Sequence, residues 1–245
     1  MTFSILAYDA ETGRYGAAAA TGSLCVGGWV LRGTLGSGLS ASQGTSPSTL
    51  WGETVLSRMK DGQPAEDAVR DTVAEDAGKA YRQLSALDPS GRTAAFTGDD
   101  STPAFGHRAA RNVIVAGNML KAESVLDAVL DSFLGSTGPM DRRLLDALTA
   151  GDAAGSDSRG LMSAALLMLG PEMPPLSLRI DCSDTPLADL RSLHARATTG
   201  LYAEWTRLVP TARHPARYPT AEDFDRLAAP PDPEGAAATP IVNTD

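Results

Sequence analysis

Cysteine is scarce in this chain of 245 residues. Only Cys25 and Cys182 are present, and their wide separation matches neither a disulfide-rich secreted domain nor a zinc or thiol-redox motif. No secretory leader precedes the first apolar run, so we expect a reducing, cytoplasmic location, although a disulfide is not excluded. Cys25 lies in a Gly-rich bend and could be a nucleophile, but a small buried side chain is the simpler interpretation.

Long hydrophobic runs and an excess of positive charge are also absent. No apolar run reaches the ~20 residues that a membrane-spanning helix needs. The net charge is −9 and the isoelectric point is about 4.8. Such an acidic chain is repelled by phosphate backbones and anionic lipids. We therefore expect no nucleic-acid partner and no membrane partner.

Motifs for metals and nucleotides are missing as well. The three histidines, His107, His194 and His214, are isolated and form no ligand spacing. There is no phosphate-binding loop, no dinucleotide fingerprint and no Gly-x-Ser-x-Gly elbow. The sequence therefore predicts neither a metal site nor a cofactor. A Ser/His/Asp triad on His107 or His194 stays open, but a half-buried structural histidine is the simpler interpretation of His194.

What the sequence does contain is a strong first hairpin. Residues 2–8 are apolar at almost every position, which is typical of a strand covered on both faces. Residues 9–13 contain Asp and Thr and end in glycine, and these residue types favour a turn. Residues 14–21 return as a second strand. Its four alanines alone would favour a helix, but flanking glycines favour a strand with close packing above it.

The rest of the chain predicts helices in sequential pairs. Residues 22–31 are expected to form a bend that becomes a strand, and residues 98–111 a loop carrying His107. Further strands are predicted at 35–43, 81–87, 93–97, 112–116, 163–169 and 176–181. Helices are predicted at 45–62, 64–73, 124–134, 140–149 and 186–208.

This order has consequences for the fold. Paired helices argue against a doubly wound parallel sheet and favour an α+β fold with two packed sheets and helices outside. We expect one domain over residues 1–208. Residues 209–245 are rich in Pro and Ala, and we interpret them as a poorly ordered or partner-wrapping tail.

The start of the first strand carries possible chemistry. If Met1 is removed, Thr2 presents a hydroxyl and a free α-amine on one residue. The α-amine has an ordinary pKa near ~7.7–8.0, so it can accept the hydroxyl proton at neutral pH. The alternative is that Thr2 is simply the first strand residue, since threonine favours strands.

Two further stretches place polar groups beside apolar strands. Gly117-Asn118 follows a short apolar strand and could supply donors to an oxyanion, or it could be an ordinary turn. Asp157, Arg159 and Ser163 surround the start of another buried strand. Polar groups there need partners, so they form either a structural network or the surroundings of a site.

Taken together, several blocks resemble one uncharacterised bacterial family, domain of unknown function 1028, which is assigned an N-terminal-nucleophile (Ntn) hydrolase-like fold. The resemblance extends over residues 2–208. It is carried by Thr2-Phe3-Ser4-Ile5, the turn at 9–13, Ser42-Gln43, Ala95-Phe96-Thr97-Gly98, Gly117-Asn118-Met119-Leu120, Arg159-Gly160 and Ser163-Ala164-Ala165-Leu166.

The resemblance implies a four-layer αββα sandwich and an amide hydrolase that acts through an acyl-enzyme. Thr2 would be the nucleophile, with Gly117 and Asn118 stabilising the oxyanion. The residues that would orient these groups or contact substrate are Ser42, Gln43, Asp157, Arg159 and Ser163. The chain departs from the proteasome-type pattern, because it lacks an early acidic residue with a lysine partner and its first lysine is Lys60.

Two functional hypotheses follow. The first is an amidohydrolase for a small amide or a short peptide. The second is a catalytically silent scaffold of the same fold that binds a small ligand or a protein partner. A homo-oligomer is compatible with either, because the predicted long helix or the Gly-rich bend could pair with a second copy.

Overall fold

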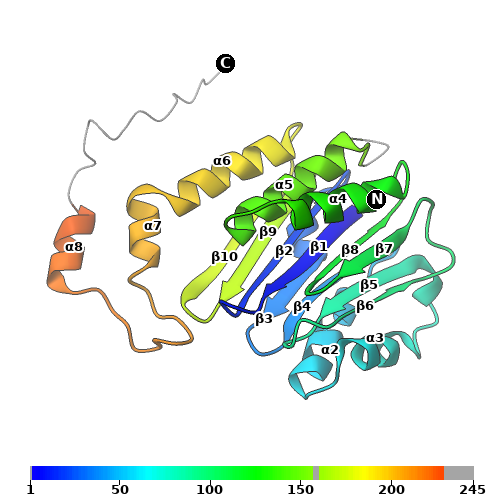
Figure 1. Cartoon of the computed structure of the whole chain (residues 1–245), viewed down its shortest axis with the longest axis horizontal. Helices are drawn as coiled ribbons and strands as arrows, with labels where there is room; N and C mark the ends of the chain where they lie inside the picture. Colours follow the sequence, from blue (N-terminus) through cyan, green and yellow to red (C-terminus); the bar gives the residue numbers. More distant parts are fainter. Residues whose placement is uncertain (1, 157–159, 229–245) are drawn as a thin grey trace.

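The first two strands form the hairpin that the sequence predicts. In the computed structural model, which describes residues 2–156 and 160–228, β1 (Thr2–Asp9) pairs antiparallel with β2 (Arg14–Thr21) (Figure 1). Between them, Gly13 adopts the left-handed φ of 66° that glycine tolerates best. The Asp9 carboxylate accepts a 2.6 Å hydrogen bond from the Thr12 hydroxyl, which closes the turn.

This hairpin lies at the centre of a six-stranded sheet. The strand order is β10-β9-β2-β1-β8-β7, and every neighbouring pair is antiparallel. The four added strands are β7 (Gly106–Ala110), β8 (Val113–Asn118), β9 (Ser163–Gly170) and β10 (Met173–Ile180).

A second, four-stranded antiparallel sheet packs against the first. Its order is β3-β4-β5-β6. The strands are β3 (Leu31–Thr34), β4 (Gly38–Gly44), β5 (Arg82–Leu87) and β6 (Thr93–Thr97).

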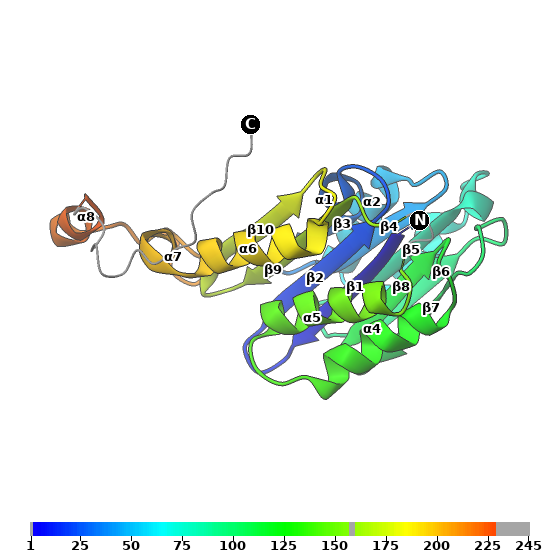
Figure 2. The same cartoon turned by 90° about the horizontal axis from the view of Figure 1, so that it is seen from above.

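Helices cover the outer faces of both sheets, which gives four layers (Figures 1 and 2). The four-stranded sheet is covered by α2 (Thr49–Lys60) and α3 (Ala65–Val73). The six-stranded sheet is covered by α4 (Ser124–Gly135), α5 (Met140–Ala153) and α6 (Pro186–Thr198). The predicted αββα sandwich of the α+β class is therefore confirmed.

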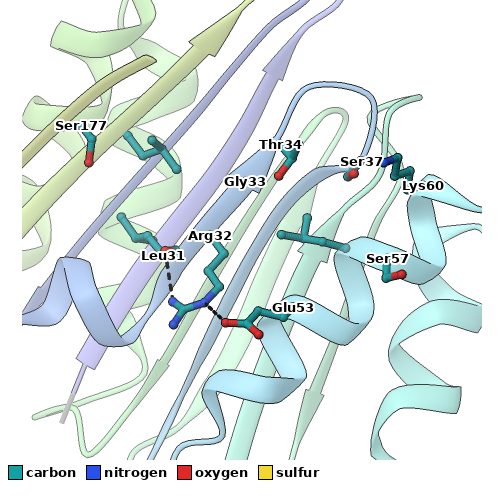
Figure 3. Close-up of a pocket in the computed structure, with 11 residues that line it drawn as sticks. Leu31, Arg32, Gly33, Thr34, Ser37, Glu53, Ser57, Lys60 and Ser177 are labelled. Atoms are coloured by element: carbon teal, nitrogen blue, oxygen red, sulfur yellow. Dashed lines mark hydrogen bonds and ion pairs between the residues drawn. The ribbon is translucent and has the colours of Figure 1, made fainter.

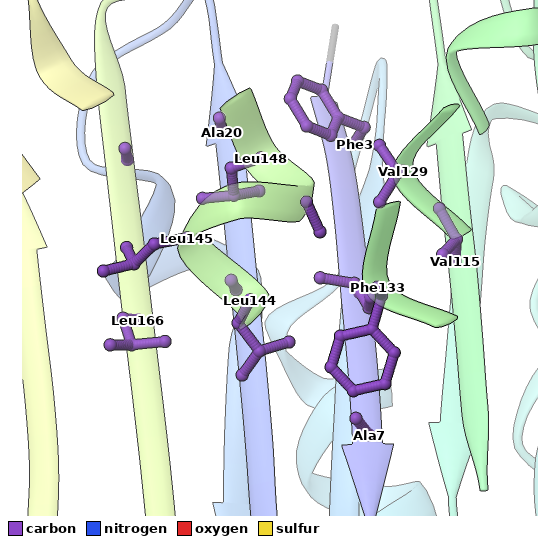
Figure 4. Packing of buried hydrophobic residues seen from close by; sticks show 14 of the residues in the cluster. Phe3, Ala7, Ala20, Val115, Val129, Phe133, Leu144, Leu145, Leu148 and Leu166 are labelled. Carbon is purple, nitrogen blue, oxygen red and sulfur yellow. The ribbon is translucent and has the colours of Figure 1, made fainter. Parts of the chain in front are cut away.

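Three apolar clusters fill the spaces between the layers. Phe3 and Ile5 of β1 pack with Leu144 and Leu148 of α5 in the outer cluster of the six-stranded sheet (Figure 4). Leu6, on the opposite face of β1, belongs to the cluster between the two sheets. The third cluster lies under α2 and α3. β1 is therefore packed on both faces, and burial of each large side chain such as Phe3 contributes ~1.5–3 kcal/mol to stability.

Three local predictions were wrong. Residues 22–31 contain a short helix, α1 (Val26–Trp29), before β3 starts. Residues 98–111 contain the edge strand β7, whose residues are half-buried or exposed and give little apolar signal. The helix predicted at 186–208 is broken after Thr198, because Thr199 is extended and Gly200 adopts a left-handed φ of 63° before α7 (Gly200–Thr206) begins.

The residues after the α/β layers are partly described. Arg213 N–H donates to the Pro171 carbonyl at 2.8 Å, and Thr211 is buried, so this segment contacts the turn between β9 and β10. It continues into α8 (Ala221–Ala228). Within residues 2–156 and 160–228, no helix is long and apolar enough to cross a bilayer.

Candidate functional site

Four polar residues form one row across the six-stranded sheet. Thr21 of β2 lies opposite Ser163 of β9 and opposite Thr2 of β1. Thr2 in turn lies opposite Asn118, the last residue of β8. Residues in register on neighbouring strands point to the same face, so the row presents four polar side chains together.

This row faces the space between the two sheets. Side chains alternate along a strand, and Leu6 and Ile114 belong to the inter-sheet cluster. Thr2 therefore shares the face of Leu6, and Asn118 shares the face of Ile114. Thr2 is 9% exposed, and its Oγ1 donates to Thr21 Oγ1 at 3.1 Å. The hydroxyl is thus almost enclosed at the end of the sandwich.

Two glutamines of the opposite sheet meet the row. Gln43 of β4 lies opposite Gln83 of β5, and Gln43 Nε2 donates to Gln83 Oε1 at 2.7 Å. Gln43 Nε2 also approaches the Thr2 carbonyl oxygen at 3.5 Å. Asn118 Nδ2 donates to the same Gln83 Oε1 at 3.1 Å, and Gln83 Nε2 donates to the Gly117 carbonyl at 2.9 Å. Side-chain amides therefore join the two sheets beside Thr2.

Unused hydrogen-bonding capacity surrounds this amide network. Gln43 Oε1, Ser4 Oγ and Ser85 Oγ are buried and have no hydrogen-bond partner among the described residues. Ser4 and Ser85 each lie two residues inward from the network, and their neighbours in register include Ala116 and Ala41. Buried polar atoms are normally paired, so these three atoms can serve a small polar ligand or water close to Thr2.

The structure separates two residues that the sequence placed together. Gln43 points into the inter-sheet space, but its neighbour Ser42 points the other way, as alternation requires. Ser42 Oγ donates to the Ser48 carbonyl at the start of α2, at 2.7 Å. Ser42 therefore lies outside the site around Thr2, and the expectation that it orients groups there is corrected.

Gly117 and Asn118 have different surroundings. Gly117 lies inside β8 and is paired with Phe3 on one side and Gly106 on the other. Its backbone N–H therefore lies in the plane of the sheet, which does not suit an oxyanion donor. Asn118 has a side-chain amide in the inter-sheet space; one N–H is used by Gln83, and the other has no partner among the described residues.

Ser163 anchors the end of the polar row. Its Oγ donates to the Ser23 carbonyl at 2.6 Å and accepts a hydrogen bond from Val26 N–H at 3.1 Å. These contacts hold the segment between β2 and α1, so Ser163 positions the site from its margin. Asp157 and Arg159, the other two predicted residues of this stretch, lie outside the described residues.

Sequence reasoning missed Thr21 and Gln83. The signal for Thr21 is the hairpin itself, because a connection of residues 10–13 pairs Asp9 with Arg14 and therefore Thr2 with Thr21. Gln83 gives no distinct signal, because Arg82 and Ser85 are also polar residues of the same strand. Gln83 is fully buried and needs several partners, but the sequence does not show which ones.

The histidines take no part in this site. His194 is 5% exposed and lies 2.7 Å from the Asp141 carboxylate, so it joins α6 to α5. The hydrogen bond from His194 holds the pKa of Asp141 below its ordinary value, although burial acts the other way. His107 is exposed on the edge strand β7. Among residues 2–156 and 160–228, no group of three or more His, Cys, Asp or Glu side chains is arranged to hold a metal ion.

A separate hollow of about 550 Å³ opens along the edge strand β3 (Figure 3). Arg32 and Glu53 form an ion pair at 3.5 Å beside it, and Lys60 and Ser177 also line it. Thr2 is not part of its lining. Both polar and apolar side chains line the hollow, and none of the residues of the amide network at Thr2 is among them.

Comparisons with known proteins give one family. A model described as a family of unknown function, DUF1028, matches residues 2–190. The chain is also similar to the crystal structure of protein SPO2555 from Silicibacter pomeroyi, itself assigned to DUF1028, with 51% identity and a TM-score of 0.87. That match covers 89% of this chain and 96% of the other. The search of curated proteins found no match.

Proposed function

This chain belongs to the DUF1028 family of unknown function, and we propose that it is an amide hydrolase whose nucleophile is Thr2 after removal of Met1. The resemblance of the sequence to Ntn hydrolases supports this chemistry. The observation that supports it best is the position of Thr2. It is the first residue of a central, doubly covered strand, and its hydroxyl lies between the sheets beside Asn118.

The chemistry uses groups on one residue and one neighbour. The free α-amine of Thr2 takes the proton from Oγ1 as Oγ1 bonds to the carbonyl carbon of the substrate amide. The carbonyl π electrons move to oxygen, and in this proposal the second N–H of Asn118 Nδ2 donates to that oxyanion. Collapse of the tetrahedral adduct breaks the C–N bond, and the α-ammonium gives its proton to the leaving amine.

Water then completes the reaction. The α-amine removes a proton from a water molecule, which adds to the acyl carbon. The ester bond to Oγ1 breaks, Oγ1 regains its proton, and the carboxylic acid leaves. Gln43, whose Oε1 is buried and unpaired within the described residues, is near enough to orient the amine or the water, because its amide approaches the Thr2 carbonyl.

The surroundings of Thr2 suit a small substrate. Thr2 is almost enclosed, and the buried polar atoms next to it belong to small or amide side chains rather than charged ones. This favours an uncharged amide of a small molecule or a short peptide over a folded protein. Activity of this kind in the cytoplasm would agree with the two unpaired cysteines.

A β-lactone probe, which acylates nucleophilic hydroxyls, tests the proposal by mass spectrometry of the intact chain and its peptides. We expect one acyl adduct on Thr2 of the processed protein. The adduct should persist in Cys25→Ala and Thr2→Ser and be lost in Thr2→Ala. A processed chain that takes no adduct on Thr2 would contradict the proposal and favour the silent scaffold that binds a ligand or partner.

A further inference from the structure

The end of the described chain forms an arm that extends from the body. This C-terminal arm, residues 199–228, comprises α7, a connecting segment and α8 (Figures 1 and 2). No residue of α8 is buried. An isolated helix of eight residues is marginal in water, so α8 needs a partner surface to be stable.

The arm also exposes large apolar side chains. Tyr202 and Trp205 of α7 are 54% and 45% exposed, Tyr218 is 79% exposed, and Phe224 of α8 is 58% exposed. Aromatic side chains gathered on one projecting segment are typical of a surface that another protein covers.

A hollow of about 360 Å³ lies between α7 and the turn of β9 and β10. We call it the arginine hollow, because Arg14, Arg207 and Arg217 line it together with the apolar Met173 and Leu176. Within the described residues, none of these three guanidinium groups forms an ion pair with a carboxylate. Among the described lining residues Glu172 is acidic, and it is already paired with Arg213 at 3.0 Å.

The charge of α8 is opposite to that of the arginine hollow. Glu222, Asp223 and Asp225 stand on this short helix against a single cation, Arg226. Arg226 is paired with Asp223 at 2.8 Å and with Glu204 of α7 at 3.8 Å, whereas Glu222 and Asp225 have no cation partner in the described part of the chain. No residue of α8 lines the hollow of its own chain.

We propose that α8 of one copy of this chain docks on the arginine hollow of a second copy, and that the exchange is reciprocal. Glu222 and Asp225, which lie three residues apart on one face of α8, would face Arg14 and Arg207 of the other copy, whereas Phe224 lies on a different face of the helix. Because each copy carries both the arm and the hollow, the contact closes as a symmetric dimer and leaves neither unpartnered. This inference does not depend on Thr2.

Charge reversal and mixing provide the test, by sedimentation equilibrium of the full-length chain. The wild type should be a dimer of 25.4 kDa subunits. Glu222→Arg with Asp225→Arg on the arm, or Arg14→Glu with Arg207→Glu in the hollow, should each raise the dissociation constant at least about tenfold. An equimolar mixture of the two double variants should form a heterodimer of wild-type affinity, because both contacts are then complementary.

Matched controls separate this contact from other effects. Glu75→Arg with Asp131→Arg changes the net charge by the same amount as the arm variant, but at exposed positions elsewhere. It should leave the dimer intact. Each variant should keep a single cooperative thermal transition, since the changed side chains lie outside the apolar clusters. A monomeric wild type, variants that stay dimeric, or a mixture that fails to associate would each overturn the proposal. Loss of the dimer on removing residues 229–245 alone would do so too, by assigning the contact to that segment.

Discussion

Asn118 and Gln83 are joined by a hydrogen bond that crosses the space between the two sheets. Asn118 Nδ2 donates to Gln83 Oε1 at 3.1 Å, and both side chains are buried. The same oxygen accepts from Gln43 at 2.7 Å. This pair fixes the plane of the Asn118 amide beside Thr2, its partner in register. The donor that the proposed chemistry needs is therefore held in place before any substrate arrives.

The first prediction concerns this donor. Asn118→Ala should lower the rate of Thr2 acylation by a β-lactone about 10²–10³-fold, the usual effect of removing one oxyanion donor. The rate is measured from the growth of the adduct in intact-mass spectra. Ser42→Ala is the matched control, because Ser42 points toward α2, and its rate should stay within about twofold. An unchanged rate in Asn118→Ala would remove this residue from the mechanism.

The second prediction concerns Gln83. Gln83→Leu removes the bonds of Gln83 to Asn118 Nδ2 and to the Gly117 carbonyl, and it leaves Gln43 Nε2 only the 3.5 Å contact with the Thr2 carbonyl. Since each buried unpaired group costs about 1–3 kcal/mol, the free energy of unfolding should fall by at least about 3 kcal/mol. Urea titration followed by circular dichroism measures it.

Gln63→Leu provides the comparison for Gln83. Gln63 is half-buried and donates to the Asp71 carboxylate at 3.2 Å. Losing one such bond should cost about 1 kcal/mol. Equal losses at the two positions would mean that the amide network contributes no more than a surface hydrogen bond.

The third prediction tests how tightly β1 is held. A Cβ at Gly151 in α5 would lie 2.7 Å from Val129 Cγ2 and 2.8 Å from Phe3 Cε2. Gly151→Ala should therefore destabilise the protein by about 1–3 kcal/mol despite the better helix propensity of alanine. Gly135→Ala, at the end of α4 with nothing within 4 Å of the added Cβ, should be neutral or stabilising. Thermal unfolding of both variants measures the difference. A stabilised Gly151→Ala would contradict the prediction, because it would show that Val129 and Phe3 move away from the added methyl group at little cost in free energy.

The fourth prediction concerns acid stability. Hydrogen bonding from His194 lowers the pKa of Asp141 in the folded chain. A lowered pKa contributes stability that is complete above the unfolded value, ~3.9, and is lost as the pH falls through the folded value. The free energy of unfolding should thus decline below pH about 4, and Asp141→Asn should flatten that decline. Asp131→Asn, at an exposed position on α4, should keep the wild-type slope. Parallel slopes in all three proteins would contradict the assignment.

Local pattern was enough to predict most strands and helices. The first hairpin could be predicted because Gly13 and the apolar stretches on both sides specify a turn and two strands without distant information. The paired helices likewise predicted the layer order, since each has an apolar face of helical period. The edge strand β7 could not be predicted from local pattern, because its side chains are half-buried or exposed and give little apolar signal. The backbone pairing of β7 with β8 stabilises it instead.

The site could be predicted only in part. Thr2 and Asn118 were identified, but their contact depends on β1 pairing with β8, which are more than 100 residues apart in sequence. Gln83 reaches them from the other sheet, and no local period encodes which sheet faces stack. Ser42 and Gln43 show the limit most clearly, because one residue of register decides which of two neighbours enters the site.

The intact mass of the untagged protein after expression in a bacterial cytoplasm shows whether Thr2 can be the nucleophile. We expect a mass lower than that of the full sequence by one methionine residue, which leaves Thr2 with a free α-amine. A chain that fully retains Met1 would have that amine bound in a peptide bond. Thr2 could not then act as its own base, and the proposed mechanism would be wrong.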